Sequence, residues 1–275
     1  MGECYNSWNM KSSQTVVYLN IGGFFIKIYF HDAENIFLQK KITDEIYKQY
    51  GKFIVSDPHR IDFYIDFTEK KFVLSLIRKK IDFFMFYTRI KPRNIETYYH
   101  ISLAQVDILI KRILFILLRG KGFILHASAS NVGGNAYIFT GKSTAGKSTA
   151  MKLLSEKYPP LADDSIIIRK QNGKFYAYQT PFIEKEHWLM RGKERYTIGK
   201  LFFLRKTPYF KTKKISDKEY IIRKLSSQFM VELPEMVKHV NILFEFVSRF
   251  DQCYELSFAI DKKKISGIIE KPSSH

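Results

Sequence analysis

The segment Gly141–Ser148 constrains this chain more than any other part of its sequence. It reads GKSTAGKS and fits the phosphate-loop pattern G-x-x-x-x-G-K-[ST]. The apolar run 136–140 before it predicts a strand, and residues 149–154 after it predict a helix. Because a phosphate loop requires this strand–loop–helix order, the sequence predicts an α/β fold that binds a nucleoside triphosphate.

The positions of this segment have separate physical roles. Glycines let the backbone turn tightly and come close to phosphate oxygens. Lys147 would place its charge on the β- and γ-phosphates, and the Ser148 hydroxyl would ligate Mg²⁺. We therefore expect ATP and Mg²⁺ as cofactors. The predicted nucleotide-binding residues are Gly141, Lys142, Ser143, Thr144, Ala145, Gly146, Lys147, Ser148 and Thr149.

Two adjacent carboxylates follow the loop closely. Only a short helix and its return separate Lys147 from Asp163 and Asp164. A parallel strand after that helix would end at the same sheet edge as the loop. Carboxylates at that edge can hold Mg²⁺ or accept a proton from an attacking hydroxyl. The alternative is that the two acids merely begin a turn before Ser165.

His126 precedes the loop, in a run 123–130 that predicts one apolar strand. A histidine in such a strand is usually a core residue hydrogen-bonded to the backbone. Here the next strand leads into the loop, so His126 could instead orient an aspartate or sense the γ-phosphate. Both interpretations stay open on these residues alone.

Together these motifs carry a family resemblance. The order Leu125-His126-Ala127-Ser128, then 141–149, then Leu161-Ala162-Asp163-Asp164 resembles the catalytic domain of the HPr kinase/phosphorylase family over residues 120–170. The shorter stand-alone relatives include kinases of lasso-peptide precursors. The resemblance implies a mixed α/β (α+β) fold with a P-loop kinase core of the HPr kinase/PEP carboxykinase type. It also implies ATP-dependent phosphorylation of a serine in a peptide or protein, with a precursor peptide of a biosynthetic cluster as the expected acceptor.

The resemblance also assigns roles to residues. It implies that Asp163 is the general base, that His126 tunes it, and that Lys147 holds the phosphates. Ser148 and Asp164 would bind Mg²⁺. The family's late basic, glycine-containing motif has no counterpart here, which argues against phosphorolysis and against HPr as the acceptor. Two alternatives remain: a nucleotide-binding regulator without phosphotransfer, and an HPr-type signalling kinase.

The chain is expected to contain two regions. Residues 1–95 predict a mainly antiparallel β region, a possible substrate-docking surface, and residues 96–275 predict the catalytic domain. In the first region we expect strands at 16–20, 24–30, 61–67, 72–77 and 81–87 and a weak helix at 32–49. In the second we expect helices at 102–118, 217–230 and 233–250 and further strands at 165–169, 174–179, 200–204 and 253–260.

The net charge of +18 has two interpretations. It could attract an acidic partner, such as nucleic acid, a membrane surface or an acidic peptide. It could also be a solvated surface, because the basic residues are scattered and the groups 79–80, 211–214 and 262–264 fall at predicted turns. We favour the second interpretation, and no nucleic-acid-binding motif is present.

The remaining expectations are weaker. The apolar stretch 106–118 contains charges and is too short to span a bilayer, and two cysteines make no disulfide framework, so a cytoplasmic location is expected. Oligomers are possible in the family, but no motif predicts one. Solvated-loop, surface-charge or packing roles are expected for Glu184, Glu186, His187, Arg191, Arg195 and Trp188.

Overall fold

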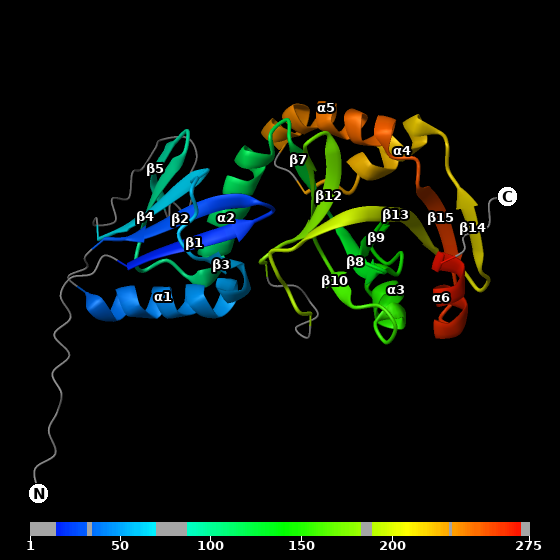
Figure 1. The fold of residues 1–275 in the computed structure, drawn as a ribbon, viewed down its shortest axis with the longest axis horizontal. Coiled ribbons are helices and arrows are strands. Elements are labelled where there is room, and N and C mark those ends of the chain that lie inside the picture. Colours follow the sequence, from blue (N-terminus) through cyan, green and yellow to red (C-terminus); the bar gives the residue numbers. More distant parts are fainter. Residues whose placement is uncertain (1–14, 32–34, 70–86, 183–188, 231–232, 271–275) are drawn as a thin grey trace, which may run out of the picture. The chain divides into compact units, whose positions relative to one another are not determined.

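The computed structural model describes residues 15–31, 35–69, 87–182, 189–230 and 233–270 (Figure 1). The fold is mixed α/β, with two mixed sheets and, in the described residues, six α-helices. The chain divides into two compact units. One comprises residues 1–20 and 25–108, and the other comprises residues 21–24 and 109–275.

The first unit is built on a six-stranded sheet with the order β3-β1-β2-β4-β6-β5. Its strands are β1 (Thr15–Ile21), β2 (Phe24–Phe30), β3 (Ile54–Val55), β4 (Phe63–Thr68), β5 (Tyr87–Lys91) and β6 (Asn94–Tyr98). Alternate residues of β1, β2 and β4 are buried, as expected when one face of a sheet is covered. Ile42, Ile46 and Tyr50 of helix α1 (Ile36–Tyr50) are buried with them.

The first sheet is mixed: it contains antiparallel pairs, which the sequence predicts, and two parallel pairs, which it does not. The central pairs β2–β4 and β4–β6 are parallel, and antiparallel pairing lies toward the edges, as in β1–β3 and β5–β6. Helix α1 accounts for the β2–β4 pair, because it lies between these strands in the chain and a crossover helix returns the chain in the same direction. The strands expected at 72–77 and at 81–86 lie outside the described residues.

The second unit contains a nine-stranded sheet. Its main path is β10-β8-β9-β13-β12-β11-β7, and β15 pairs with both β13 and β14. The strands are β7 (Gly122–Leu125), β8 (Ala127–Val132), β9 (Asn135–Thr140), β10 (Pro160–Ala162), β11 (Ile166–Gln171), β12 (Lys174–Gln179), β13 (Arg195–Lys206), β14 (Lys211–Lys214) and β15 (Cys253–Phe258). The three strands β9, β13 and β15 run parallel to one another.

Helices cover both faces of this second sheet (Figure 1). On one face, α4 (Lys218–Ser226) and α5 (Leu233–Arg249) bury residues such as Leu225 and Phe246 against the sheet. On the other, α3 (Lys147–Leu154) and α6 (Lys262–Glu270) bury Leu154 and Ile265. Because apolar side chains are buried on both faces, the sheet is held in place between the helices, and so is the strand end that carries the loop 141–146.

Three local expectations are corrected. The strand expected over 123–130 is interrupted at His126, because β7 pairs with β11 whereas β8 pairs with β9 and β10. The basic run 211–214 is a strand, β14, and not a turn. The run 262–264 begins helix α6.

Helix α2 spans Leu103–Leu118, and in the described parts of the chain no helix is long and apolar enough to cross a membrane.

Candidate functional site

The loop 141–146 connects β9 to α3, as the motif predicts. Gly146 caps α3 in a left-handed conformation with φ of 94°. The first bond of the helix joins the Ala150 N–H to the Gly146 carbonyl at 2.8 Å. The N–H groups of residues 147–149 precede that bond, as at every helix N-terminus, where they and the helix dipole favour an anion.

Backbone geometry explains the choice of glycine at position 146. A Cβ there would lie 2.7 Å from the ring of Phe258, and the positive φ is unfavourable for any residue with a side chain. Thr144 also has a positive φ, of 69°, which is unusual for a β-branched residue. Such strained positions cluster at ligand clamps.

Lys147 folds back over the loop. Its Nζ donates to the carbonyl of Gly141 at 2.9 Å and to that of Lys142 at 3.3 Å, and the residue is only 8 % exposed. The ammonium therefore stands at the mouth of the loop, where a phosphate would meet it. Ser148 follows in the first turn of α3 and is half-buried.

The register of the strands brings the other predicted residues to the same edge. Ala127 of β8 pairs with Thr140, which ends β9, and Ala129 pairs with Ala162, which ends β10. Both β9 and β10 are antiparallel to β8, so they run in the same direction and end beside the start of β8. Asp163 and Asp164 follow β10 directly, and His126 directly precedes β8.

His126 contacts Asp164 through one ring nitrogen. Its Nδ1 lies 2.9 Å from the Asp164 carbonyl oxygen and 3.2 Å from Oδ1. Both side chains are partly accessible, at 35 % for His126 and 38 % for Asp164. The backbone of His126 is held on both sides, because its N–H donates to the Gln228 carbonyl and its own carbonyl accepts from Thr140 Oγ1.

Asp163 lies deeper than its neighbour. It is 2 % exposed, and the Ser128 hydroxyl donates to its carbonyl oxygen at 2.8 Å and lies 3.4 Å from Oδ1. Ser128 is fully buried in β8. The side chain that holds Asp163 therefore comes from the strand adjacent to both β9 and β10.

A cavity of about 550 Å³ opens beside the loop. Residues 141–145 form one wall, and the ends of β13 and β15 and the helix α4 form the others. Sequence reasoning missed the residues on those walls. A basic pair at the end of a strand, Arg205-Lys206, is the signal that could have found them. The cationic and polar residues on these walls include Arg205, Lys206, Tyr220, Lys224, Gln228 and Glu255.

The weaker candidates do not join this site. Arg191 donates to the carbonyl of Pro181 at 2.6 Å, and the Arg195 guanidinium lies over the Tyr176 ring at 4.4 Å. Both side chains therefore make local structural contacts. Glu184, Glu186, His187 and Trp188 lie outside the described residues. In the described part of the chain, no group of three or more His, Cys, Asp and Glu side chains is arranged to hold a metal ion.

The chain was compared with protein families, curated proteins and solved structures. No protein-family model matches this sequence, and no curated protein matches it. Among solved structures, the chain is similar to the Hpr(Ser) kinase/phosphatase from Coxiella burnetii, with 15 % identity and a TM-score of 0.25 over 34 % of this chain and 72 % of that one. At these values the likeness assigns no activity, so function must be argued from the residues of the site.

Proposed function

We propose that this protein is an ATP-dependent kinase that phosphorylates a serine hydroxyl in a peptide or protein. One observation carries the proposal: the phosphate-loop residues, the pair Asp163-Asp164 and His126 occupy a single sheet edge. A phosphate cradle alone would support only binding. Carboxylates and a histidine at the same edge add groups that can accept a proton beside a bound phosphate.

The residues present fit a magnesium-bound triphosphate. The loop has the glycine that a close backbone approach requires, a helix N-terminus, and the Lys147 ammonium at its mouth. Ser148 and Asp164 would hold Mg²⁺, which proteins often bind through one or two side chains together with substrate phosphates and water. When bound, the ion would neutralise charge on the phosphate oxygens.

Each side chain then has a definite task in transfer. Lys147 and the loop amides would position the phosphates and offset negative charge as it develops. Asp163 would accept the proton of the acceptor hydroxyl, and Ser128 would hold that aspartate in place. The resemblance pairs His126 with Asp163, but its Nδ1 contact is with Asp164, which it would orient.

One observation favours the opposite assignment of the two aspartates. The side chain of Asp164 is 38 % accessible and contacts His126, whereas Asp163 is buried. In that arrangement Asp164 accepts the proton and Asp163 serves the metal. The variants Asp163→Asn and Asp164→Asn separate the two, because loss of the base lowers turnover at saturating Mg²⁺, whereas a weakened metal site is compensated by excess Mg²⁺.

The test is incubation of the purified protein with ATP, Mg²⁺ and a library of serine-containing peptides, read by mass spectrometry. We expect a phosphate adduct on serine with the wild type and none with Lys147→Ala. Tight ATP binding without any adduct or ATP hydrolysis would favour a nucleotide-binding regulator instead.

A further inference from the structure

Beyond the phosphate loop, a second cavity of about 580 Å³ adjoins the one beside residues 141–145. Tyr220 and Glu255 line both cavities, so the two meet at this pair. The second cavity is bounded by residues 213–217, which end β14 and lead into α4. We refer to these two adjoining cavities, which extend from the phosphate loop to β14 on either side of the Tyr220–Glu255 pair, as the path.

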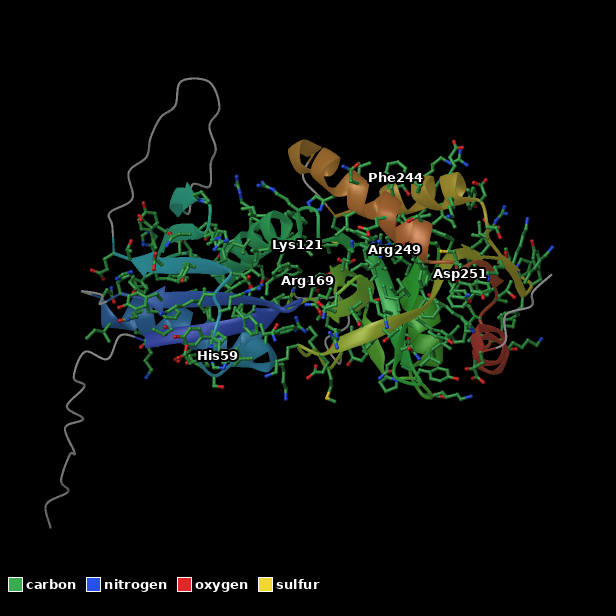
Figure 2. The ribbon with its side chains drawn as sticks, turned by 45° about the horizontal axis from the view of Figure 1, so that its top comes forward. His59, Lys121, Arg169, Phe244, Arg249 and Asp251 are labelled. Carbon is green, nitrogen blue, oxygen red and sulfur yellow. The ribbon has the colours of Figure 1, made fainter. Side chains whose placement is uncertain are left out.

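Cationic side chains dominate the walls of this path. They are Lys142, Arg205, Lys206, Lys213, Lys214 and Lys224. Lys214 lies 3.7 Å from Asp251, which is labelled in Figure 2 beyond the end of α5. Within the described residues, no ion pair joins Arg205, Lys206, Lys213 or Lys224 to a carboxylate.

The strand register aligns part of this charge. One row across β13, β15 and β14 contains Arg205, Ser257 and Lys211. A second row, two residues away along each strand, contains Phe203, Glu255 and Lys213. Because directly paired residues point to the same face, Arg205, Lys211 and Lys213 share one face of the three strands. Cations on neighbouring strands repel one another unless an anion lies between them.

The carboxylates on the path have other partners. Glu255 accepts a hydrogen bond from the Tyr220 hydroxyl, and burial together with this carboxylate raises the pKa of Tyr220 to about 12. Tyr220 therefore remains a protonated donor near neutral pH. Asp217 caps α4 by accepting from the Tyr220 N–H at 3.0 Å. Glu255 is also the direct cross-strand partner of Lys213 and offsets part of that charge, whereas Arg205 is directly paired with Ser257 and not with an acid.

We propose that this path binds an acidic segment of the acceptor peptide and places a neighbouring hydroxyl at the phosphate loop. The role of the peptide as phosphate acceptor rests on the proposed kinase function. Binding of its acidic segment does not, and it can be measured without turnover. A triphosphate on the loop already has Lys147 and the helix N-terminus as partners. The additional cations extend along two cavities as far as β14, which fits an extended chain with several carboxylates.

Fluorescence anisotropy with labelled synthetic peptides tests the proposal. One peptide carries a single serine flanked by glutamates, and its partner has glutamine at those positions. We expect the wild type to prefer the acidic peptide, and Arg205→Gln/Lys213→Gln to weaken its binding by about tenfold or more, with salt reducing the difference. The matched control Lys174→Gln/Lys264→Gln removes two exposed lysines elsewhere and should bind like the wild type.

Two outcomes would overturn the proposal. One is equal affinity for the acidic and neutral peptides. The other is that Arg205→Gln/Lys213→Gln loses ATP affinity but keeps peptide affinity, which would make the path part of the nucleotide site. Lys147→Ala distinguishes this inference from the kinase proposal, because that variant should lose ATP binding but retain the acidic peptide. Selective acidic-peptide binding without any phosphotransfer by the wild type would sink the kinase proposal and support the binding site.

Discussion

Nδ1 of His126 lies 3.2 Å from Oδ1 of Asp164 and 2.9 Å from the carbonyl oxygen of the same residue. The two residues adjoin different strands, since His126 separates β7 from β8 and Asp164 lies just after β10. The contact therefore forms because strand pairing brings these two segments together, and not because the residues are close in sequence. It joins the segment before the loop to the segment after it.

Replacing His126 by alanine should lower turnover while leaving ATP affinity nearly unchanged. The ring contacts the aspartate side of the site, whereas the phosphates would bind the loop amides and Lys147. We expect kcat to fall by about tenfold to a hundredfold. This is no more than the smallest effects of losing a general base, because His126 would orient the aspartate and would not itself take the proton. Steady-state kinetics and calorimetric ATP titration measure the two effects. A rise in the dissociation constant of ATP with unchanged kcat would contradict this role.

Replacing Lys147 by alanine should remove the ammonium that donates to the loop carbonyls of Gly141 and Lys142. Because the ammonium would neutralise phosphate charge, we expect transfer to fall by about a hundredfold or more. Filter-binding of labelled ATP and transfer assays give the result. The exposed Lys174→Ala is the control, and a similar loss there would show a general effect of net charge.

Gly146→Ala should destabilise the loop more than Gly134→Ala. Both glycines have positive φ, 94° and 83°, but a Cβ at Gly146 would lie 2.7 Å from the Phe258 ring whereas one at Gly134 meets nothing within 4 Å. Gly134→Ala thus reports backbone strain alone, about 1–2 kcal/mol. Urea unfolding should show a larger loss for Gly146→Ala, together with lost ATP binding. Equal losses would mean that the ring contact has no cost.

Cys253 should be chemically inert in the folded protein. It is fully buried in β15, and burial raises the pKa of its thiol from 9.0 to about 12. In a Cys4→Ser variant at pH 8, thiolate should be about a thousandfold scarcer at Cys253 in the folded than in the unfolded chain. Titration with a disulfide reagent, with and without urea, measures this. Rapid reaction without urea would show that the site is open.

The same shift has a consequence for stability at high pH. Because the folded-state pKa lies above the unfolded value, the contribution of the protonated thiol is complete below about pH 9 and is lost as pH rises toward 12. Unfolding free energy should therefore fall over that range more steeply in the wild type than in Cys253→Ala. Parallel slopes for the two proteins would argue against the shift.

Local sequence signals predicted the elements around the loop. The strand before residue 141 and the helix after 146 are confirmed, as are the strands expected at 165–169 and 174–179, which pair as a hairpin across Asn172-Gly173. The helix expected from residue 102 is also confirmed, and it begins with a capping box: the Gln105 N–H donates to Ser102 Oγ and the Ser102 N–H donates to Gln105 Oε1. These signals depend on neighbours within a few residues, so they can be read from the chain directly.

Long-range pairing could not be predicted in the same way. The sequence does not show that β2, β4 and β6 are parallel neighbours, because each pair is set by a crossover and not by a turn motif. The same holds for Arg205, whose position depends on the parallel pairing of β13 with β9 and β15. The interruption at His126 was missed because no turn residue marks it and the residues on both sides of it are buried.

The central claim is that the loop and the two aspartates together transfer phosphate to a hydroxyl. Its most direct test is transfer of label from γ-³²P-ATP to a serine peptide, measured for the wild type and Asp163→Asn/Asp164→Asn in parallel with ATP binding at saturating Mg²⁺. We predict labelled phosphoserine with the wild type, and ATP binding without transfer in the double variant. Transfer by the double variant at the wild-type rate, or no transfer by the wild type to any serine peptide, would contradict the account.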